Sequence, residues 1–485
     1  MTRELRRLSI VLLAMFLALF TSVSVIQVVQ ADALAENPAN TRALYDSYEV
    51  QRGSIIASGA AIASSVPSDD VYSWQRVYQN ANVWAPVTGY INPVLGSATG
   101  IEQAMNAELS GTGSTQFLSR IERIITGQPA AGSNVVLSLD ATAQQAAYDA
   151  LGDLTGAVLA IEPETGRILA MVTSPDYDPN ALASHDTSAV LDLYDQLESD
   201  PAQPLSNRAI GGDLNPPGST FKLVTASAAL ATGDWTPESE LPNPSTYTLP
   251  GSSSVIRNAS GGACGSGDTV TIADALRLSC NIPFAELAVE LGDQTILEEA
   301  ERYGFNVAFE TPLASTPSSY PRGLDDAQTA LSGFGQGQVT ATPLQMAMVS
   351  AGIANDGIVM NPRMVDRVIG PDLSVQQTFE DTEFGRALES DLAAEMVTMM
   401  VDNVENGVAG GARIDGVDVA GKTGTAENGT DDPYTLWFTG FAPAEDPEIA
   451  VAVVVEDGGG QGQSGSGDTI AAPIAKQVME AVLGQ

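Results

Sequence analysis

The chain has 485 residues, of which 44% are apolar, so it is long enough for two or three domains with a buried core. Its 60 acidic and 21 basic residues give a net charge of −39, which repels phosphate backbones, so we expect no nucleic acid partner. Two cysteines and one histidine exclude zinc sites built on four cysteines or on several histidines. A Ser-His-Asp triad would have to use that histidine, His185, which stands in a polar, loop-like run and is expected to be solvated.

The amino terminus predicts a membrane anchor. Residues 8–31 contain no charged side chain, and about 20 residues of helix suffice to cross the hydrocarbon core of a bilayer. Three arginines precede this stretch and acidic residues follow it, which leaves the remainder of the chain outside the cell. A cleavable signal is the alternative, because Ala31-Asp32-Ala33 resembles a cleavage site, but the apolar core of such signals is usually about 7–15 residues. We therefore expect residues 1–31 to form a cytoplasmic tip and a single uncleaved span.

An exported location permits a disulfide bond. Cys264 and Cys280 lie 16 residues apart, and closing a loop of that size stabilises a fold by roughly 3 kcal/mol. Two free thiols are the alternative, because nothing in the sequence fixes their geometry.

The remainder of the chain divides at residue 134. Residues 32–133 mix short β-like stretches with Gly, Ser and Asn, which predicts a small, irregular stalk domain. Beyond them the pattern predicts a strand at 134–139, a helix at 141–151, and a hairpin of two strands at 156–161 and 167–173.

The carboxy-terminal part, 134–485, predicts one α+β domain. Residues 219–410 are rich in Ala and Leu with helical periodicity. Three strands are expected at the end of the chain, at 417–425, 435–441 and 449–455. A loop at 458–467 and a last helix at 470–483 follow them. Because strands at both ends flank a helical middle, we expect one sheet completed by both ends of this domain.

Ser219 is expected at the amino terminus of a helix, because Pro216-Pro217-Gly218 precede it and a run of good helix formers follows. Free N–H groups at such an end favour developing negative charge. Lys222 lies three residues further on, on the same helix face, and can take the serine's proton if burial lowers its pKa. It is one of only three lysines in a chain that otherwise uses arginine, which cannot lose its proton near neutral pH. Taken alone, S-x-x-K is common, and a solvated lysine is equally consistent.

Two further motifs follow along the chain. Ser279-Cys280-Asn281 closes a helix that begins with a capping-box-like Thr271-Ile-Ala-Asp274, and its hydroxyl and amide could relay a proton and hold a peptide carbonyl. Lys422-Thr423-Gly424-Thr425 ends an expected strand, where glycine leaves space for a substrate to pair and the hydroxyls and ammonium could receive a carboxylate. In isolation a helix-end cap and a surface turn explain them equally well.

Together the three motifs are specific. The order S-x-x-K, S-x-N, K-T-G resembles that of the serine acyltransferases, which include penicillin-binding proteins and class A β-lactamases. Other segments resemble the class B penicillin-binding proteins, in particular an actinomycete group with a short stalk: Arg52-Gly53-Ser54-Ile55, Thr88-Gly89-Tyr90, Gly100-Ile101-Glu102, Asn207-Arg208-Ala209, Gly335-Gln336-Gly337, Thr342-Pro343-Leu344-Gln345 and Trp437-Phe438-Thr439-Gly440-Phe441. The resemblance implies a β-lactamase/transpeptidase-like fold, an antiparallel sheet with flanking helices and a helical subdomain.

The resemblance also implies the activity, peptidoglycan D,D-transpeptidation through a Ser219 acyl-enzyme that β-lactams inhibit. It assigns Lys222 as the base, Ser279 with Lys422 as the proton shuttle, and Asn281 as the ligand of the substrate amide. It assigns the substrate carboxylate to Thr423 and Thr425 beside Gly424, and the oxyanion to the backbone N–H groups of Ser219 and Thr425. The implied partners are stem peptides, β-lactams, the cell membrane and proteins of elongation or division, and the implied mechanism needs no metal or cofactor.

Competing functions share parts of this pattern. A class A β-lactamase would add a Glu-x-x-x-N segment, which the region 310–325 does not offer, and has no use for a stalk. A β-lactam sensor usually carries several membrane spans. A D,D-carboxypeptidase, with water as the acceptor, and a non-catalytic scaffold remain alternatives, although intact motifs argue against the scaffold. Leu436 departs from many relatives, which carry a polar residue or His there, and the change suggests altered acceptor contacts.

Overall fold

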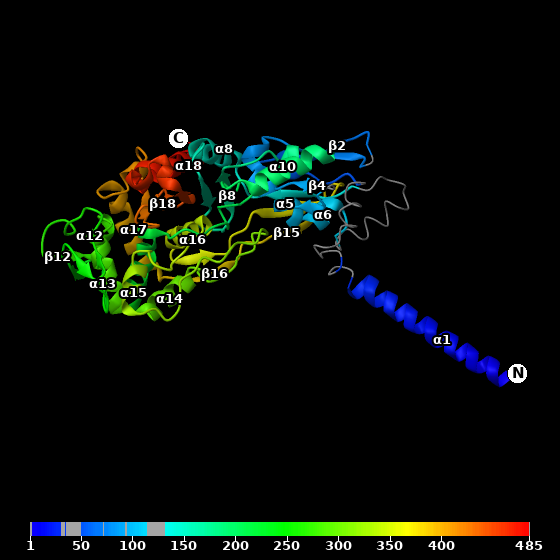
Figure 1. Ribbon diagram of the computed structural model, residues 1–485, viewed down its shortest axis with the longest axis horizontal. Helices are drawn as coiled ribbons and strands as arrows, with labels where there is room; N and C mark the ends of the chain where they lie inside the picture. Colours follow the sequence, from blue (N-terminus) through cyan, green and yellow to red (C-terminus); the bar gives the residue numbers. More distant parts are fainter. Residues whose placement is uncertain are drawn as a thin grey trace.

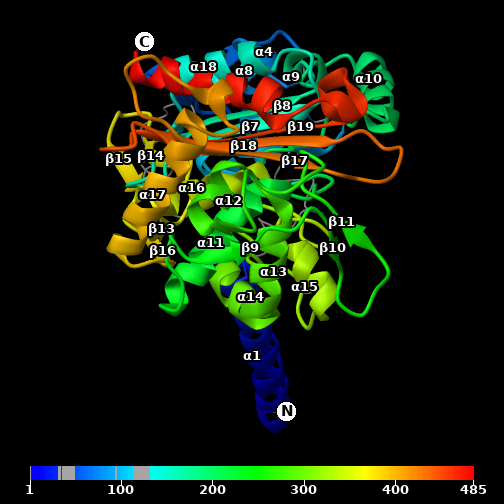
Figure 2. The same cartoon turned by 90° about the vertical axis from the view of Figure 1, so that its left-hand side faces the viewer.

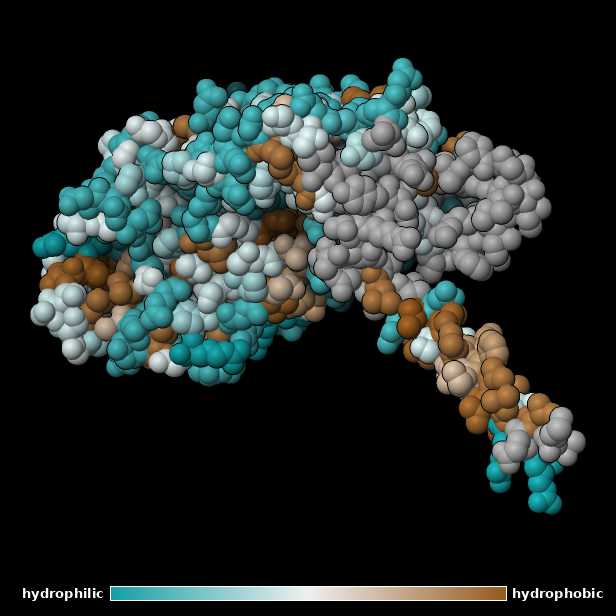
Figure 3. Space-filling view, turned by 45° about the vertical axis from the view of Figure 1, so that its right-hand side comes forward, coloured by the Kyte–Doolittle hydropathy of each residue, from teal (hydrophilic) through white to brown (hydrophobic). Residues whose placement is uncertain are grey.

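The computed structural model describes residues 2–30, 34, 50–70, 72–92, 95–113 and 131–484, so the cleavage-site-like Ala31-Asp32-Ala33 lies outside the described residues. Helix α1 (Thr2–Ser24) continues into a π-helical turn, Val25–Val29, and projects from the body of the molecule (Figure 1). Residues Leu5–Val29 have a mean hydropathy of 2.5 and none of them is buried, which leaves a long apolar rod (Figure 3). This helix is long and apolar enough to cross a membrane.

A five-stranded antiparallel sheet forms the centre of the carboxy-terminal part. Its strand order is β17 (Ala420–Ala426), β18 (Thr435–Ala442), β19 (Ile449–Val455), β7 (Gly156–Ile161) and β8 (Ile168–Ser174). The pairing of β19 with β7, with Val453 opposite Val158, joins the two ends of the domain in one sheet, as predicted.

Helices cover both faces of this sheet, seen edge-on in Figure 2, so every residue of β18 and β19 is buried. On one face Phe438 and Val453 pack with α8 (Ala141–Leu151) and α18 (Ala472–Leu483). On the other, Trp437 and Ala452 face α16 (Pro343–Ala354) and the helical half of the domain.

The helical half surrounds α11 (Lys222–Thr232), whose first nine residues are all buried. Its other elements are α12 (Ile272–Arg277), α13 (Asn281–Leu291), α14 (Asp293–Arg302), α15 (Asp326–Ser332), α17 (Ser390–Glu405) and the paired short strands β9 (Glu240–Pro242) with β12 (Thr269–Thr271), β10 (Tyr247–Thr248) with β11 (Val255–Ile256) and β13 (Ile358–Met360) with β16 (Glu383–Arg386).

The amino-terminal region is more regular than the sequence indicates, because its sheet takes strands from distant parts of the chain. The order of the six strands is β15 (Val375–Thr378), β14 (Val365–Ile369), β6 (Asn134–Leu137), β1 (Ile55–Ala57), β2 (Ala60–Pro67) and β3 (Trp74–Tyr78). The strand expected at 134–139 therefore pairs with β1, with Val135 opposite Ile55, and not with the five-stranded sheet. Helices α4 (Ala81–Thr88), α5 (Gly100–Ala104) and α6 (Asn106–Ser110) complete this region, with the strand pair β4 (Ile91–Asn92) and β5 (Ser97–Ala98).

A buried ion cluster ties these elements together. Glu102, on α5, accepts from Arg52 Nε and from Arg76 Nε at 2.6 Å each, and all three side chains are buried. Arg76 also donates to the carbonyl of Gly53 at 2.8 Å. The segments Arg52-Gly53 and Ile101-Glu102 therefore have a structural role: they join the start of the sheet to α5.

Two short helices, α9 (Pro179–Leu182) and α10 (Thr187–Ser199), lie between β8 and the turn that carries Ser219. His185, between them, contacts Asp70 and the ring of Tyr72, none of which belongs to the three motifs.

Candidate active site

Ser219 lies in a 3-10 turn, Gly218–Phe221, that leads directly into α11. The turn is held from two sides: the Gly218 N–H donates to the carbonyl of Gly335 at 2.9 Å, and Trp437 Nε1 donates to the carbonyl of Pro216 at 2.9 Å. A Cβ on Gly335 would stand 2.0 Å from the Gly218 oxygen, so only glycine allows this approach. The segments 335–337 and 437–441 therefore position the turn that carries the hydroxyl.

Lys222 is the closest basic group to that hydroxyl. Its Nζ lies 2.9 Å from Ser219 Oγ, and it also donates to the carbonyl of Ser279 at 2.8 Å and to Asn281 Oδ1 at 2.9 Å. The side chain is fully buried. Burial, and secondly the neighbouring charge of Lys422, hold the pKa of Lys222 well below the ordinary value for lysine.

Ser279 lies between the two buried lysines. Its Oγ accepts a hydrogen bond from Lys422 Nζ at 2.7 Å and lies 3.4 Å from Lys222 Nζ. Lys422 also donates to the carbonyl of Thr423 at 2.9 Å, and burial lowers its pKa to about 7. Ser279 has φ +56°, a left-handed conformation that is uncommon for residues other than glycine and is often found at functional sites.

The motif Ser279-Cys280-Asn281 does not close the helix that starts at Thr271. That helix, α12, ends at Arg277, whereas Asn281 is the first residue of α13. The predicted cap at Thr271 is present, with its Oγ1 accepting from the N–H of Asp274 at 3.1 Å. The motif therefore occupies a tight link between two helices, which needs the left-handed backbone at Ser279.

Asn258 is a positioning residue that the sequence pattern does not reveal. Its Oδ1 accepts from the N–H groups of Asn281 and Ile282 at 2.8 and 2.9 Å, and so caps α13 from 23 residues upstream. The neighbouring carbonyl of Arg257 accepts from Asn281 Nδ2 at 3.1 Å. An Asn in a Gly/Ser-rich loop normally predicts a turn, and only the fold shows that it binds a distant helix.

Cys264 and Cys280 are joined in a disulfide, with their Cα atoms 5.8 Å apart. Asn243 donates to the carbonyl of Cys264 at 2.8 Å, so the loop that carries Cys264 is also held by a buried side chain. Because Cys280 lies between Ser279 and Asn281, this bond ties the second motif to the loop 257–264.

Strand β17 forms the opposite side of the site and carries Lys422, Thr423, Gly424 and Thr425. Thr423 Oγ1 donates to the carbonyl of Val408 at 3.1 Å, and Thr425 Oγ1 accepts from the N–H of Gly467 at 3.3 Å. The strand lies directly against the nucleophile turn, because a Cβ on Gly218 would stand 3.2 Å from the carbonyl of Thr425.

Gly424 faces the nucleophile turn, contrary to the prediction that it leaves space for a substrate. A Cβ at residue 424 would stand 2.8 Å from the carbonyl of Pro217 and 3.1 Å from Thr220 Cγ2. The space that glycine leaves is therefore filled by the nucleophile turn and not by a substrate.

Other residues singled out from the sequence lie elsewhere. Lys476, the third lysine, pairs with Glu480 at 3.6 Å on α18. Leu436 is fully buried, and Gly465 packs closely against its Cδ1. The Leu436 side chain therefore faces the core, and an effect of this residue on acceptor contacts would have to be indirect.

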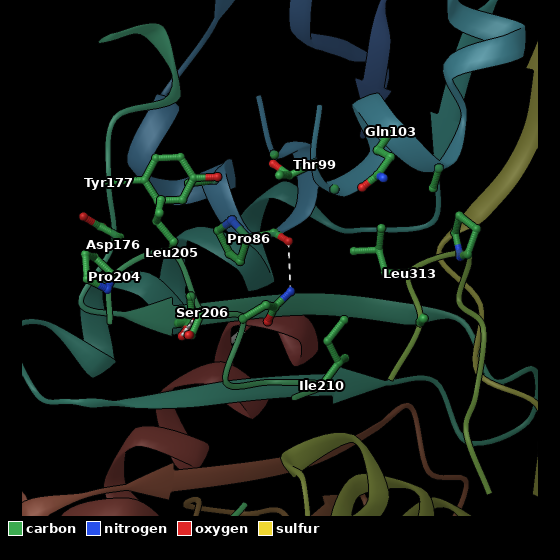
Figure 4. Close-up of a pocket in the computed structure, with 18 residues that line it drawn as sticks. Pro86, Thr99, Gln103, Asp176, Tyr177, Pro204, Leu205, Ser206, Ile210 and Leu313 are labelled. Atoms are coloured by element: carbon green, nitrogen blue, oxygen red, sulfur yellow. Dashed lines mark hydrogen bonds between the residues drawn. The ribbon is translucent and has the colours of Figure 1, made fainter. Parts of the chain in front are cut away.

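A cavity of about 480 Å³ lies between the amino-terminal region and the five-stranded sheet, away from Ser219 (Figure 4). Tyr177, Gln103 and Leu313 line it from three different segments. At its floor Asn207 Nδ2 donates to the carbonyl of Pro86 at 2.9 Å, which links α4 to the segment before Ser219. Asn207 therefore supports the contact between the two regions and does not belong to the site.

The chemistry of the site follows from this geometry. A buried lysine with a lowered pKa lies within hydrogen-bond distance of a serine hydroxyl at the start of a helix, and a second serine bridges it to another lysine. Such an arrangement activates a serine for attack on a carbonyl and provides a route for the proton. Fold and site together define a serine acyl-transfer enzyme of the Ser-Lys type.

Comparisons with known proteins identify the family. Residues 156–480 match the penicillin-binding protein transpeptidase domain, and residues 52–135 match the penicillin-binding protein A dimerisation domain. The chain is similar to peptidoglycan D,D-transpeptidase PbpA of Mycolicibacterium smegmatis, with 41% identity over 100% of this chain and 99% of the relative. The same enzyme of Mycobacterium tuberculosis is 40% identical over the same shares of the two chains.

Solved structures of penicillin-binding proteins have the same fold as this chain. The ceftriaxone acyl-enzyme complex of penicillin-binding protein A from M. tuberculosis superimposes with a TM-score of 0.87 and 40% identity, over 90% of this chain and 100% of that one. Its penicillin G acyl-enzyme complex gives 0.85 and 39% over the same shares. The chain belongs to the penicillin-binding protein transpeptidase family.

Proposed function

We propose that this chain is a peptidoglycan D,D-transpeptidase that cross-links stem peptides through an acyl-enzyme on Ser219, and that β-lactams acylate the same residue. The observation that carries the proposal is the 2.9 Å contact between Ser219 Oγ and the Nζ of a fully buried Lys222. The names of the M. smegmatis and M. tuberculosis relatives, which share the chain's full length, support the substrate.

Acylation begins when neutral Lys222 accepts the proton of Ser219 and Oγ attacks the carbonyl of the penultimate D-alanine. The backbone N–H groups of Ser219 and Thr425 hold the oxyanion, and one such donor is typically worth about 2.7–4 kcal/mol. The close packing of the Gly218 turn on Thr425 supports this pairing, since it brings the two backbone segments together.

Release of the terminal D-alanine needs a proton on its nitrogen. Ser279 delivers it, because its hydroxyl lies 2.7 Å from Lys422 Nζ and 3.4 Å from Lys222 Nζ. Asn281 binds the substrate amide, and Thr423 and Thr425, on the strand beside Gly424, bind the terminal carboxylate. An amine of a second stem peptide then attacks the acyl carbonyl, forms the cross-link and releases Ser219.

The long apolar helix supports an assignment of residues 1–31 to a cytoplasmic tip and membrane anchor, with the catalytic part outside the cell. We propose 32–133 as the stalk and 134–485 as the transpeptidase domain, and the limits of the two family matches support a division in this region. Proteins of elongation or division are the proposed partners at the membrane.

The proposal is tested by supplying the full-length protein, in detergent, with a donor stem peptide ending in D-Ala-D-Ala and an acceptor peptide with a free amine. We expect a cross-linked peptide and one free D-alanine for each bond formed, seen by mass spectrometry, and neither with Ser219→Ala. Release of D-alanine with only the shortened peptide would replace the proposal with a D,D-carboxypeptidase. A folded wild-type protein that yields no product would point to a scaffold.

A further inference from the structure

Arg257 stands beside the second motif of the site. It directly follows β11, which Figure 2 shows at the edge of the helical half, below the sheet in that view. Its carbonyl accepts from Asn281 Nδ2 at 3.1 Å. The next residue, Asn258, is buried and binds the N–H groups of Asn281 and Ile282. Residue 257 therefore keeps a fixed place next to the amide of Asn281.

The guanidinium of Arg257 is exposed and makes no hydrogen bond or ion pair with any described residue. This is unusual in a chain with 60 acidic residues, where most arginines of the described part, such as Arg363 with Asp366 and Asp381, have carboxylate or carbonyl partners. Among the described arginines beyond the anchor helix, only Arg367, on β14, is likewise exposed and without a hydrogen bond or ion pair of its guanidinium. An exposed guanidinium without a partner, on a residue whose carbonyl is fixed beside Asn281, is available to a ligand.

The site has little other positive charge to offer an anionic peptide. Lys222 and Lys422 are fully buried, and their ammonium groups face Ser219, Ser279 and Asn281. The net charge of −39 repels an anion that approaches from solution. The guanidinium fork matches a carboxylate through two parallel hydrogen bonds, which suits Arg257 to this role.

We propose that Arg257 is a specificity-determining residue that binds a free carboxylate on the donor stem peptide, in the residues that precede the terminal D-alanine pair. The inference rests on the proposed function, since it needs a peptide amide on Asn281. When Asn281 binds the amide of a donor peptide, the residues that precede the terminal D-alanine pair would pass residue 257. The guanidinium of Arg257 could then bind a carboxylate on one of their side chains.

The test uses two donor pentapeptides ending in D-Ala-D-Ala that differ only in whether the third side chain ends in a carboxylate or a carboxamide. We expect the wild-type protein to favour the carboxylate donor roughly fivefold in kcat/KM, through KM, which is the scale of an exposed ion pair. Arg257→Ala loses this preference and keeps the rate on the carboxamide donor. Arg367→Ala, the matched control, behaves as wild type.

Acylation by benzylpenicillin, which lacks the stem peptide, separates this inference from the proposed function. We expect the same acylation rate in wild type, Arg257→Ala and Arg367→Ala. A preference that survives in Arg257→Ala, or that falls equally in Arg367→Ala, would overturn the specific role of Arg257. A loss of benzylpenicillin acylation in Arg257→Ala alone would assign the residue to the support of Asn281 instead. A wild-type protein that is not acylated would refute the proposed function itself.

Discussion

At the scale of single residues, the role of Lys222 depends on its ability to lose a proton. Lys222→Arg keeps the positive charge but removes the base, since a guanidinium stays protonated near neutral pH. We expect acylation by benzylpenicillin to slow by about 10²–10⁴-fold, the usual contribution of general base catalysis. Lys476→Arg, at the half-buried pair with Glu480 on α18, is the matched control and should keep the wild-type rate.

Circular dichroism of both variants separates a lost base from a lost fold, because the larger arginine side chain must fit a fully buried position. A folded Lys222→Arg protein that acylates at nearly the wild-type rate would exclude Lys222 as the base.

The same lysines predict how acylation depends on pH. Burial, and then Lys422, lowers the pKa of Lys222, and burial lowers the pKa of Lys422 to about 7. Lys222 accepts a proton only in its neutral form, so the rate should rise as pH increases through its lowered pKa and fall in acid. Measured by stopped-flow with a chromogenic β-lactam, the rise should be complete well below the ordinary lysine pKa of about 10.4. A rate that climbs only near pH 10 would contradict a buried, neutral base.

At the scale of elements, the Arg52–Glu102–Arg76 cluster should control the stability of the amino-terminal sheet. Burial alone would raise the pKa of Glu102, but the charges of Arg76 and Arg52 outweigh it and hold that pKa below its usual value. Glu102→Gln leaves two buried guanidiniums without a counter-charge, so we expect the free energy of unfolding to fall by about 3–5 kcal/mol.

Chemical denaturation measures this change, and Glu298→Gln, at an exposed position on α14, serves as the control. Because the folded pKa of Glu102 is lowered, its stabilisation is present above the unfolded pKa of about 4.3 and is lost as pH falls through the folded value. Equal stability of Glu102→Gln and wild type would show that the cluster does not hold the sheet.

The periodicity of the sequence predicts most helices and strands correctly, but it does not predict which distant segments they contact. The hairpin of β7 and β8, the helix α8 and the three carboxy-terminal strands have clear periodicity and turn residues, and they stand where the sequence puts them. The three motifs also contain the residues that meet around Ser219. Asn258 could not be found in this way, because its bonds to α13 depend on a loop conformation that the disulfide and Asn243 fix.

At the scale of the whole molecule, two sheets join segments that are distant in the sequence. β19 pairs with β7 across almost three hundred residues, and β14 pairs with β6, with Val368 opposite Val135. The pairing of β19 with β7 could be predicted, because strands at both ends of a domain favour one shared sheet. The sequence of residues 365–378, in contrast, does not indicate that these residues belong to the amino-terminal sheet. The stalk therefore looks irregular in sequence because three strands of its sheet, β6, β14 and β15, lie outside residues 32–133.

The proposed mechanism depends above all on an acyl-enzyme at Ser219. The most direct test is the intact mass of the full-length protein, in detergent, with and without benzylpenicillin, beside Ser219→Ala. We predict one stable penicilloyl adduct on the wild-type chain and none on a folded Ser219→Ala, whose small hydroxyl contributes little to stability. Rapid hydrolysis of the drug without an adduct, or an adduct that persists in Ser219→Ala, would contradict the assignment.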